Sequence, residues 1–193
     1  INDCFFILDY CKSKNMGIED FSSNAVGEEE IKSAVMVYKL CKFLDSQMRK
    51  MGLRDYSDQL IDAIRIFKEH KEIIPNFEHV LIDEYQDVNS TQHELIELLS
   101  PKNIFCVGDP RQSIFGWRGS NIRYILNFEE KYPECEMITL TKNYRSSQYI
   151  VDLINKSIKN MKLPDLESII KAKKDIKLLK FETEYAEFEF VIQ

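Results

Sequence analysis

The sequence has little glycine and proline, and it has no long apolar run. Six glycines and five prolines among 193 residues exclude collagen-like and low-complexity classes. No apolar stretch approaches the roughly 18 residues that a membrane-spanning helix needs. The N-terminus lacks the basic-then-apolar pattern of a secretory signal. We therefore expect a globular protein with no membrane partner.

An excess of positive charge is also missing, because 26 basic residues face 32 acidic ones, for a net charge of -6. This balance excludes a uniformly basic nucleic-acid coat and leaves room for a local basic or aromatic groove. No Cys-x-x-Cys pair occurs, and the three histidines have no metal-ligand spacing. The odd number of scattered cysteines argues against a disulfide framework or a zinc site and favours the reducing cytoplasm. These cysteines are Cys4, Cys11, Cys41, Cys106 and Cys135.

The first 74 residues carry helical patterns and no visible chemistry. Apolar residues recur every three or four positions from Ile31 to Met51, which predicts a helix that ends near Gly52. A second stripe at Leu60, Ile61, Ile64 and Phe67 predicts another helix. We interpret both stripes as core-packing faces.

After Pro75, short apolar runs alternate with helical patterns. Runs at 80–82, 104–107 and 137–140 predict strands, and a further strand is predicted at 176–181. This alternation is typical of an α/β fold whose parallel sheet is covered on both faces. Helices are expected after Thr91, where Thr91 and Glu94 suggest a capping box, in the segment around Ile150 to Ile158, and from Tyr185 onward.

Two carboxylates follow the first predicted strand, at Asp83 and Glu84. Ligands of open α/β sheets bind at the carboxyl ends of the strands. A carboxylate there can hold Mg²⁺, and a second one can orient and deprotonate an attacking water. Nucleotide hydrolysis requires both a bound Mg²⁺ and an activated water molecule. The alternative is an acidic turn in solvent.

A turn-rich segment at 107–120 follows the second predicted strand. Gln112 has the donor and acceptor groups that can sense a terminal phosphate. Trp117 is the only tryptophan, and Phe115, Gly116 and Arg118 flank it. An exposed aromatic beside arginine can stack on the bases of single-stranded nucleic acid. The alternative is a tryptophan buried in the core.

A third polar segment, 141–147, follows the third apolar run. Arg145 can reach a phosphate as an arginine finger, and Tyr144 can cover a nucleobase or a sugar. The alternative is an arginine that makes only a surface ion pair.

The three segments together resemble motifs II, III and IV of the UvrD/Rep/PcrA-type superfamily 1 DNA helicases. The resembling strings are Asp-Glu-Tyr-Gln-Asp at 83–87, Gly-Asp-Pro-Arg-Gln-Ser-Ile-Phe-Gly-Trp-Arg-Gly at 108–119, and Asn-Tyr-Arg-Ser-Ser at 143–147. Their order and spacing also agree with the family. Residues 55–60 resemble a stretch found upstream of motif II, and residues 188–191 are similar to the start of a helix in the second motor domain.

The resemblance implies a fold and a set of roles. The fold would be a partial RecA-like, P-loop NTPase sheet at 75–135, with a helical insertion at 1–74 and the start of a second RecA-like domain at 136–193. The cofactors would be ATP and Mg²⁺, and the partner would be single-stranded DNA. By resemblance Asp83 would coordinate Mg²⁺ and Glu84 would activate the attacking water. Gln112 would contact the γ-phosphate, Tyr144 would lie near the nucleotide, and Arg145 would act as an arginine finger across the cleft. The DNA would be held by Phe115, Trp117 and Arg118.

The sequence departs from the family in what it lacks. No Gly-x-x-x-x-Gly-Lys-Ser/Thr loop occurs, and motifs V and VI are missing. Pro110 and Arg111 replace an acidic pair common in relatives. We therefore expect an internal fragment of an ATP-dependent 3′–5′ DNA helicase that hydrolyses ATP poorly or not at all. We also expect exposed apolar sheet edges, through which the fragment associates with itself or borrows a strand.

Two alternatives remain open at this stage. The chain could be a non-catalytic module that binds nucleic acid or a partner on a degenerate helicase scaffold. It could also come from a helicase fused to a nuclease, since such fusions resemble the same motifs. Nucleotide-insensitive binding through Trp117 would favour the first alternative.

Overall fold

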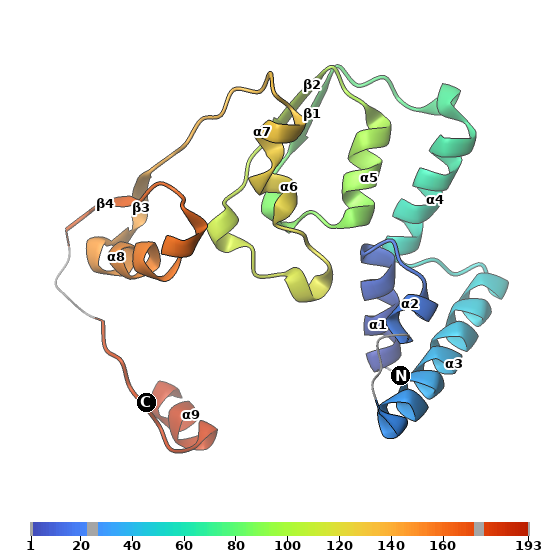
Figure 1. Ribbon diagram of the computed structural model, residues 1–193, viewed down its shortest axis with the longest axis horizontal. Coiled ribbons are helices and arrows are strands. Elements are labelled where there is room, and N and C mark those ends of the chain that lie inside the picture. Colours follow the sequence, from blue (N-terminus) through green and yellow to red (C-terminus); the bar gives the residue numbers. More distant parts are fainter. Residues whose placement is uncertain (1, 23–26, 172–175, 193) are drawn as a thin grey trace. The chain divides into compact units, whose positions relative to one another are not determined.

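The structure, a computed structural model, describes residues 2–22, 27–171 and 176–192 (Figure 1). The chain divides into two compact units, Ile1–Cys135 and Glu136–Gln193. No helix among the described residues is both long enough and apolar enough to cross a bilayer.

The first unit begins with a cluster of helices, as the sequence predicts. A small core joins the first and third of them, where Cys4, Leu8 and Cys41 are buried together. Burial raises the pKa of the Cys41 thiol to about 11. The predicted stripe of the third helix is buried only around Cys41, because Ile31 and Val35 are exposed. The four helices are α1 (Asn2–Ser13), α2 (Ile18–Ser22), α3 (Glu28–Lys50) and α4 (Tyr56–Glu69).

A charged triad connects α1 to the start of α4. Asp55 is the N-cap of α4 and forms a capping box with Asp58. Lys12 of α1 lies 2.7 Å from a carboxylate oxygen of each aspartate, and all three side chains are partly shielded from solvent. Burial by itself lowers the pKa of Lys12, but the hydrogen bonds to Asp55 and Asp58 and the negative charges of these two carboxylates together outweigh it and raise that pKa. The triad therefore stabilises the junction of the two helices at neutral pH.

A parallel pair of strands forms the centre of the first unit. Strand β1 (His79–Ile82) pairs in register with β2 (Asn103–Cys106), so that Leu81 lies beside Phe105. Helix α5 (Ser90–Leu99) connects them, which confirms the predicted strand–helix–strand order. The predicted capping box is wrong by two residues, because Asn89 is the N-cap and Gln92 its partner. Thr91 is instead buried, and its hydroxyl donates a hydrogen bond to the Lys12 carbonyl.

One face of this two-stranded sheet is covered. Tyr85, Val88 and Phe128 form its core with residues from α5 and from the two short helices α6 (Arg123–Leu126) and α7 (Phe128–Lys131). On the other face Leu81 is 72% exposed and Phe105 is 58% exposed. The prediction of a sheet covered on both faces is therefore wrong for the described residues.

Single 3₁₀ turns occur at η1 (Lys71–Ile73), η2 (Tyr85–Asp87), η3 (Pro110–Gln112) and η4 (Gly116–Arg118).

The second unit also contains a parallel pair, but not where the apolar runs predict it. Strand β3 (Lys142–Ser147) pairs with β4 (Glu167–Ile170). The predicted strands at 137–140 and 176–181 have no regular structure, and Ile138, Leu140 and Leu178 are exposed. A strand needs a hydrogen-bonding neighbour, and the polar segment at 142–147 has one, whereas the apolar runs have none within the described part of the chain.

The helices of the second unit agree with the sequence. Helix α8 (Gln148–Ser157) buries Val151 completely, and a short turn η5 (Lys159–Met161) follows it. The Asn155 side chain holds the chain that leads into β4, because its amide exchanges two hydrogen bonds with the Leu166 backbone. Helix α9 (Glu184–Ile192) confirms the predicted C-terminal helix.

The charged triad generates a stability prediction. Burial alone raises the pKa of Asp58, but the hydrogen bonds from Lys12 and from the Asp55 N–H, together with the positive charges of Lys12 and Arg49, outweigh this effect and lower the pKa. A lowered pKa means that the triad stabilises the fold above about pH 4 and loses this contribution as the pH falls further. Lys12→Met should reduce the free energy of unfolding by about 2–3 kcal/mol at pH 7, measured by urea denaturation.

The difference between Lys12→Met and wild type should shrink as the pH falls below about 4. Lys39→Met is the matched control, because Lys39 lies exposed on α3 and forms no ion pair within the described ranges. The control should change stability by less than about 0.5 kcal/mol. An equal loss in both variants would show that the triad contributes nothing specific.

Candidate functional site

Asp83 and Glu84 lie exposed at the carboxyl end of β1. The Glu84 backbone has φ 51° and ψ 43°, in the left-handed region, and its N–H donates a hydrogen bond of 2.9 Å to Asp83 Oδ1. Few residues other than glycine adopt this conformation, and it costs backbone energy. The strained turn directs two adjacent carboxylates to the same edge of the sheet.

A buried glutamine joins the ends of the two strands. Gln86 is only 1% exposed. Its Nε2 donates to a Glu84 carboxylate oxygen at 2.7 Å, and its Oε1 accepts from the Asp109 N–H at 3.0 Å. Asp109 Oδ2 in turn accepts from Gln112 Nε2 at 3.3 Å. We call this set of four residues the Gln86 bridge; it brings Glu84 and Gln112 into one hydrogen-bonded series.

Gly108 makes the Gln86 bridge sterically possible. A Cβ at this position would lie 2.7 Å from Gln86 Oε1 and 2.8 Å from Ile125 Cδ1. Both contacts are shorter than van der Waals packing allows. The absence of a side chain therefore lets the buried amide lie directly against the backbone after β2. Sequence reasoning missed Gln86, although a glutamine between acidic neighbours in a conspicuous motif was an available signal.

A hollow of about 390 Å³ opens beside the carboxylates. Asp87 lies in its wall, and one of its carboxylate oxygens is buried without a hydrogen-bond partner in the described part of the chain. Burial and the nearby Glu84 charge raise the pKa of Asp87. Within the described residues no cluster of three or more His, Cys, Asp or Glu side chains could hold a metal. The other lining residues are Ile82, Asp83, Glu84, Val88, Gln92, Leu95 and Ile96.

The predicted aromatic residues lie on an exposed loop that continues from the Gln86 bridge. Trp117 is 54% exposed, so the alternative of a tryptophan buried in the core is wrong. The Arg118 guanidinium lies 5.0 Å from the centroid of the Trp117 ring and 5.8 Å from that of Phe115. The two aromatic rings lie 6.3 Å apart and are tilted by 55°. The loop therefore presents two rings and one cation close together.

Tyr144 and Arg145 lie in the second unit, on β3, and both are exposed. The Asn143 side chain fixes the backbone of this part of β3, because it accepts hydrogen bonds from the N–H groups of Arg145 and Ser146 at 2.9 and 2.7 Å. No ion pair of Arg145 occurs among the residues that the structure describes. The predicted roles of Tyr144 and Arg145 at a nucleotide stay predictions.

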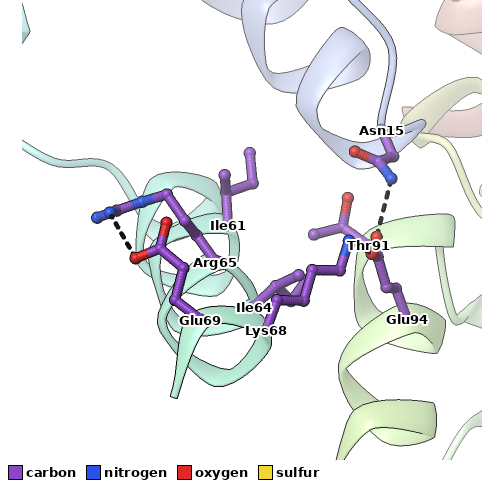
Figure 2. Close-up of a pocket in the computed structure, with 8 residues that line it drawn as sticks. All are labelled: Asn15, Ile61, Ile64, Arg65, Lys68, Glu69, Thr91 and Glu94. Carbon is purple, nitrogen blue, oxygen red and sulfur yellow. Dashed lines mark hydrogen bonds and ion pairs between the residues drawn. The ribbon is translucent and has the colours of Figure 1, made fainter. Parts of the chain in front are cut away.

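A second hollow, of about 290 Å³, contains none of the sequence-predicted site residues (Figure 2). Its charged groups pair with one another: Glu94 accepts from Asn15 at 2.8 Å and pairs with Lys68, and Arg65 pairs with Glu69. We interpret it as a packing gap between α4, α5 and the end of α1, bridged by ion pairs. The other lining residues are Ile61, Ile64 and Thr91.

The tight packing around Gly108 makes an alanine at this position destabilising. Gly108→Ala should lower the free energy of unfolding by about 1–3 kcal/mol, because the added methyl group overlaps Gln86 and Ile125. Gly116→Ala is the matched control, since a Cβ at Gly116 meets nothing within 4 Å. Urea denaturation measures both. Equal stability of the two variants would contradict the tight contact at Gly108.

Comparison with known proteins identifies the family. Residues 5–133 match the UvrD/REP helicase N-terminal domain. The chain is 39% identical over 131 residues to the ATP-dependent DNA helicase PcrA of Staphylococcus epidermidis, a match that covers 65% of this chain and 18% of that protein. It is 40% identical over 120 residues to PcrA of Staphylococcus aureus strain Mu50, covering 59% of this chain and 16% of that protein. The chain thus matches less than a fifth of the length of these relatives. The predicted resemblance is confirmed at the level of the family: this chain belongs to the UvrD/REP helicases.

Proposed function

We propose that this chain is part of the motor of an ATP-dependent DNA helicase that moves 3′ to 5′ along single-stranded DNA. The observation that carries the proposal is the Gln86 bridge. It joins a candidate catalytic carboxylate, Glu84, to a candidate phosphate sensor, Gln112, through a series of hydrogen bonds. The loop that continues from Gln112 leads to the exposed Trp117. Membership of the UvrD/REP family supports the proposal.

The proposal assigns a part of the motor to each stretch of the chain. Residues 1–74 form the helical insertion of the first motor domain, and residues 75–135 form part of its RecA-like sheet. Residues 136–193 form the beginning of the second RecA-like domain. The parallel strand pairs β1–β2 and β3–β4 are compatible with this assignment.

Asp83 fits the demands of a magnesium ion that is also bound to phosphates. Mg²⁺ commonly takes one or two protein carboxylates and completes its shell with water and phosphate oxygens. Asp83 is exposed at a strand end, and no ion pair involves it within the described ranges. When bound, Mg²⁺ neutralises phosphate charge. Asp83 would supply its carboxylate ligand.

Glu84 is the candidate general base. Its exposed carboxylate can accept the proton of an attacking water, while the hydrogen bond from Gln86 Nε2 fixes one of its oxygens. Gln112 holds Asp109 by a long bond of 3.3 Å, which a terminal phosphate oxygen can replace. If Gln112 gave up its hydrogen bond to Asp109 for one to the phosphate, the loop that carries Trp117 would respond to bound nucleotide. Tyr144 would cover the nucleotide, and Arg145 would stabilise charge in the transition state.

Phe115, Trp117 and Arg118 form the candidate single-strand site. Aromatic rings stack on bases of any sequence, and an adjacent guanidinium attracts the phosphate backbone. The exposure of Trp117 and the closeness of Arg118 support this role. Binding of this kind tolerates an overall negative charge, because the contacts are local.

A second candidate function is a non-catalytic module that binds single strands. The observation that favours it is the cluster of Trp117 with Phe115 and Arg118. Stacking of bases on aromatic rings does not require nucleotide hydrolysis. Binding that requires Trp117 and is indifferent to ATP would support this candidate.

Self-association of the isolated chain is a further part of the proposal. The exposed side chains Leu81 and Phe105 lie together on the uncovered face of the β1–β2 sheet. Contiguous apolar surface of this kind favours association.

The catalytic assignment is tested in the protein encoded by the whole gene. Glu84→Gln should lower single-strand-stimulated ATP hydrolysis by about 10²–10⁴-fold, because the amide cannot accept the proton, while nucleotide binding persists. Glu129→Gln is the control, since Glu129 is an exposed glutamate of α7. Phosphate release and equilibrium binding of ATP are the two measurements. Undiminished hydrolysis in Glu84→Gln would contradict the assigned base.

A further inference from the structure

Helix α1 is fixed against the loop that carries Trp117. Its last residue, Ser13, is buried beside Gly119, which has φ +97°. A Cβ on Gly119 would collide with the Ser13 hydroxyl, so only glycine permits this approach. Thr91 of α5 donates a hydrogen bond to the Lys12 carbonyl at the same helix end. The C-terminal turn of α1 is therefore held from two sides.

The same face of α1 reaches Trp117. Phe6 lies seven residues before Ser13, which places both on one helix face about 10 Å apart along the axis. The Phe6 ring stacks with the Trp117 ring at a centroid distance of 6.0 Å and an interplanar angle of 19°. Two contacts thus join α1 to the loop, Ser13 with Gly119 and Phe6 with Trp117.

The stacked pair is a surface feature and not part of the core. Phe6 is 49% exposed, close to the 54% of Trp117. The core between this helix and α3 consists of Cys4, Leu8 and Cys41, without Phe6. Two nearly parallel, half-exposed rings with the Arg118 cation 5.0 Å from one of them have the chemistry of a stacking surface for nucleobases.

We propose that Phe6 is a further binding residue for single-stranded DNA. Its ring holds the indole of Trp117 in place and extends the surface on which bases stack, so that α1 becomes part of the site. This inference rests on the proposed function, in which Trp117 stacks on bases. If Phe6 instead covered the face of the indole on which bases stack, removal of the Phe6 ring would strengthen binding of single-stranded DNA.

The inference is tested by the affinity of the 193-residue protein for a fluorescent oligothymidylate of about 16 nucleotides, measured by anisotropy. Phe6→Ala should raise the dissociation constant about two- to tenfold, as expected for the loss of one aromatic pair. Phe6→Leu, which keeps the apolar bulk, should also weaken binding, and Phe6→Tyr should preserve it. Phe5→Ala is the matched control, because Phe5 is similarly exposed on α1 and has no ring contact with Trp117 in the described structure. It should leave affinity unchanged.

Tryptophan emission gives a second measurement that is independent of DNA. Trp117 is the only tryptophan of the chain. Phe6→Ala should shift its emission to the red in the free protein, because the indole loses its apolar neighbour, whereas Phe5→Ala should not. An unshifted spectrum in Phe6→Ala would overturn the stacked contact.

The outcomes separate this inference from the proposed function. If Trp117→Ala weakens binding and Phe6→Ala does not, the inference is overturned and the single-strand site stands. Tighter binding by Phe6→Ala overturns it as well, since Phe6 would then be a cover. If the protein does not bind the oligonucleotide, or binds it equally well without the Trp117 ring, both proposals fail.

Discussion

The candidate site depends on one buried side chain, the amide of Gln86. A primary amide has donors on its nitrogen and an acceptor on its oxygen, so it can donate to one group and accept from another at the same time. Here it connects the Glu84 carboxylate to the Asp109 backbone N–H, and thereby the end of β1 to the end of β2. Because the amide is shielded from water, loss of the Glu84 carboxylate would leave its Nε2 only a long hydrogen bond of 3.4 Å to Asp87 Oδ2, and a poorly satisfied buried donor is costly. The geometry of the exposed residues around it therefore follows from an interior constraint.

Much of the fold follows from local patterns in the sequence. The alternation of apolar runs with helices was sufficient to predict β1, α5 and β2, because their burial and connection are both local properties. The strands of the second unit were mispredicted, since β3 is a polar segment whose strand conformation depends on pairing with β4, some 25 positions further along the chain. Apolar composition at 137–140 and 176–181 indicated strands, but neither segment has a pairing partner among the residues that the structure describes.

In the candidate site, too, local sequence patterns predicted some residues, whereas another depends on a contact between distant parts of the chain. Asp83, Glu84 and Gln112 were visible as polar residues just after apolar runs, and the structure places them at adjoining strand ends. Phe6 carried no such signal, since an apolar residue on an amphipathic helix looks like core until its partner is known. The packing of Ser13 against Gly119, more than 100 positions away in the sequence, helps to bring Phe6 to Trp117.

The thiol in the middle of the helical core has a practical consequence. Cys41 is fully buried between α1 and α3, and its pKa of about 11 keeps it protonated at neutral pH. Alkylating reagents attack the thiolate, and they need access to it. Modification of Cys41 therefore requires α1 and α3 to separate, so its alkylation kinetics report how often this pair of helices opens during native-state fluctuations.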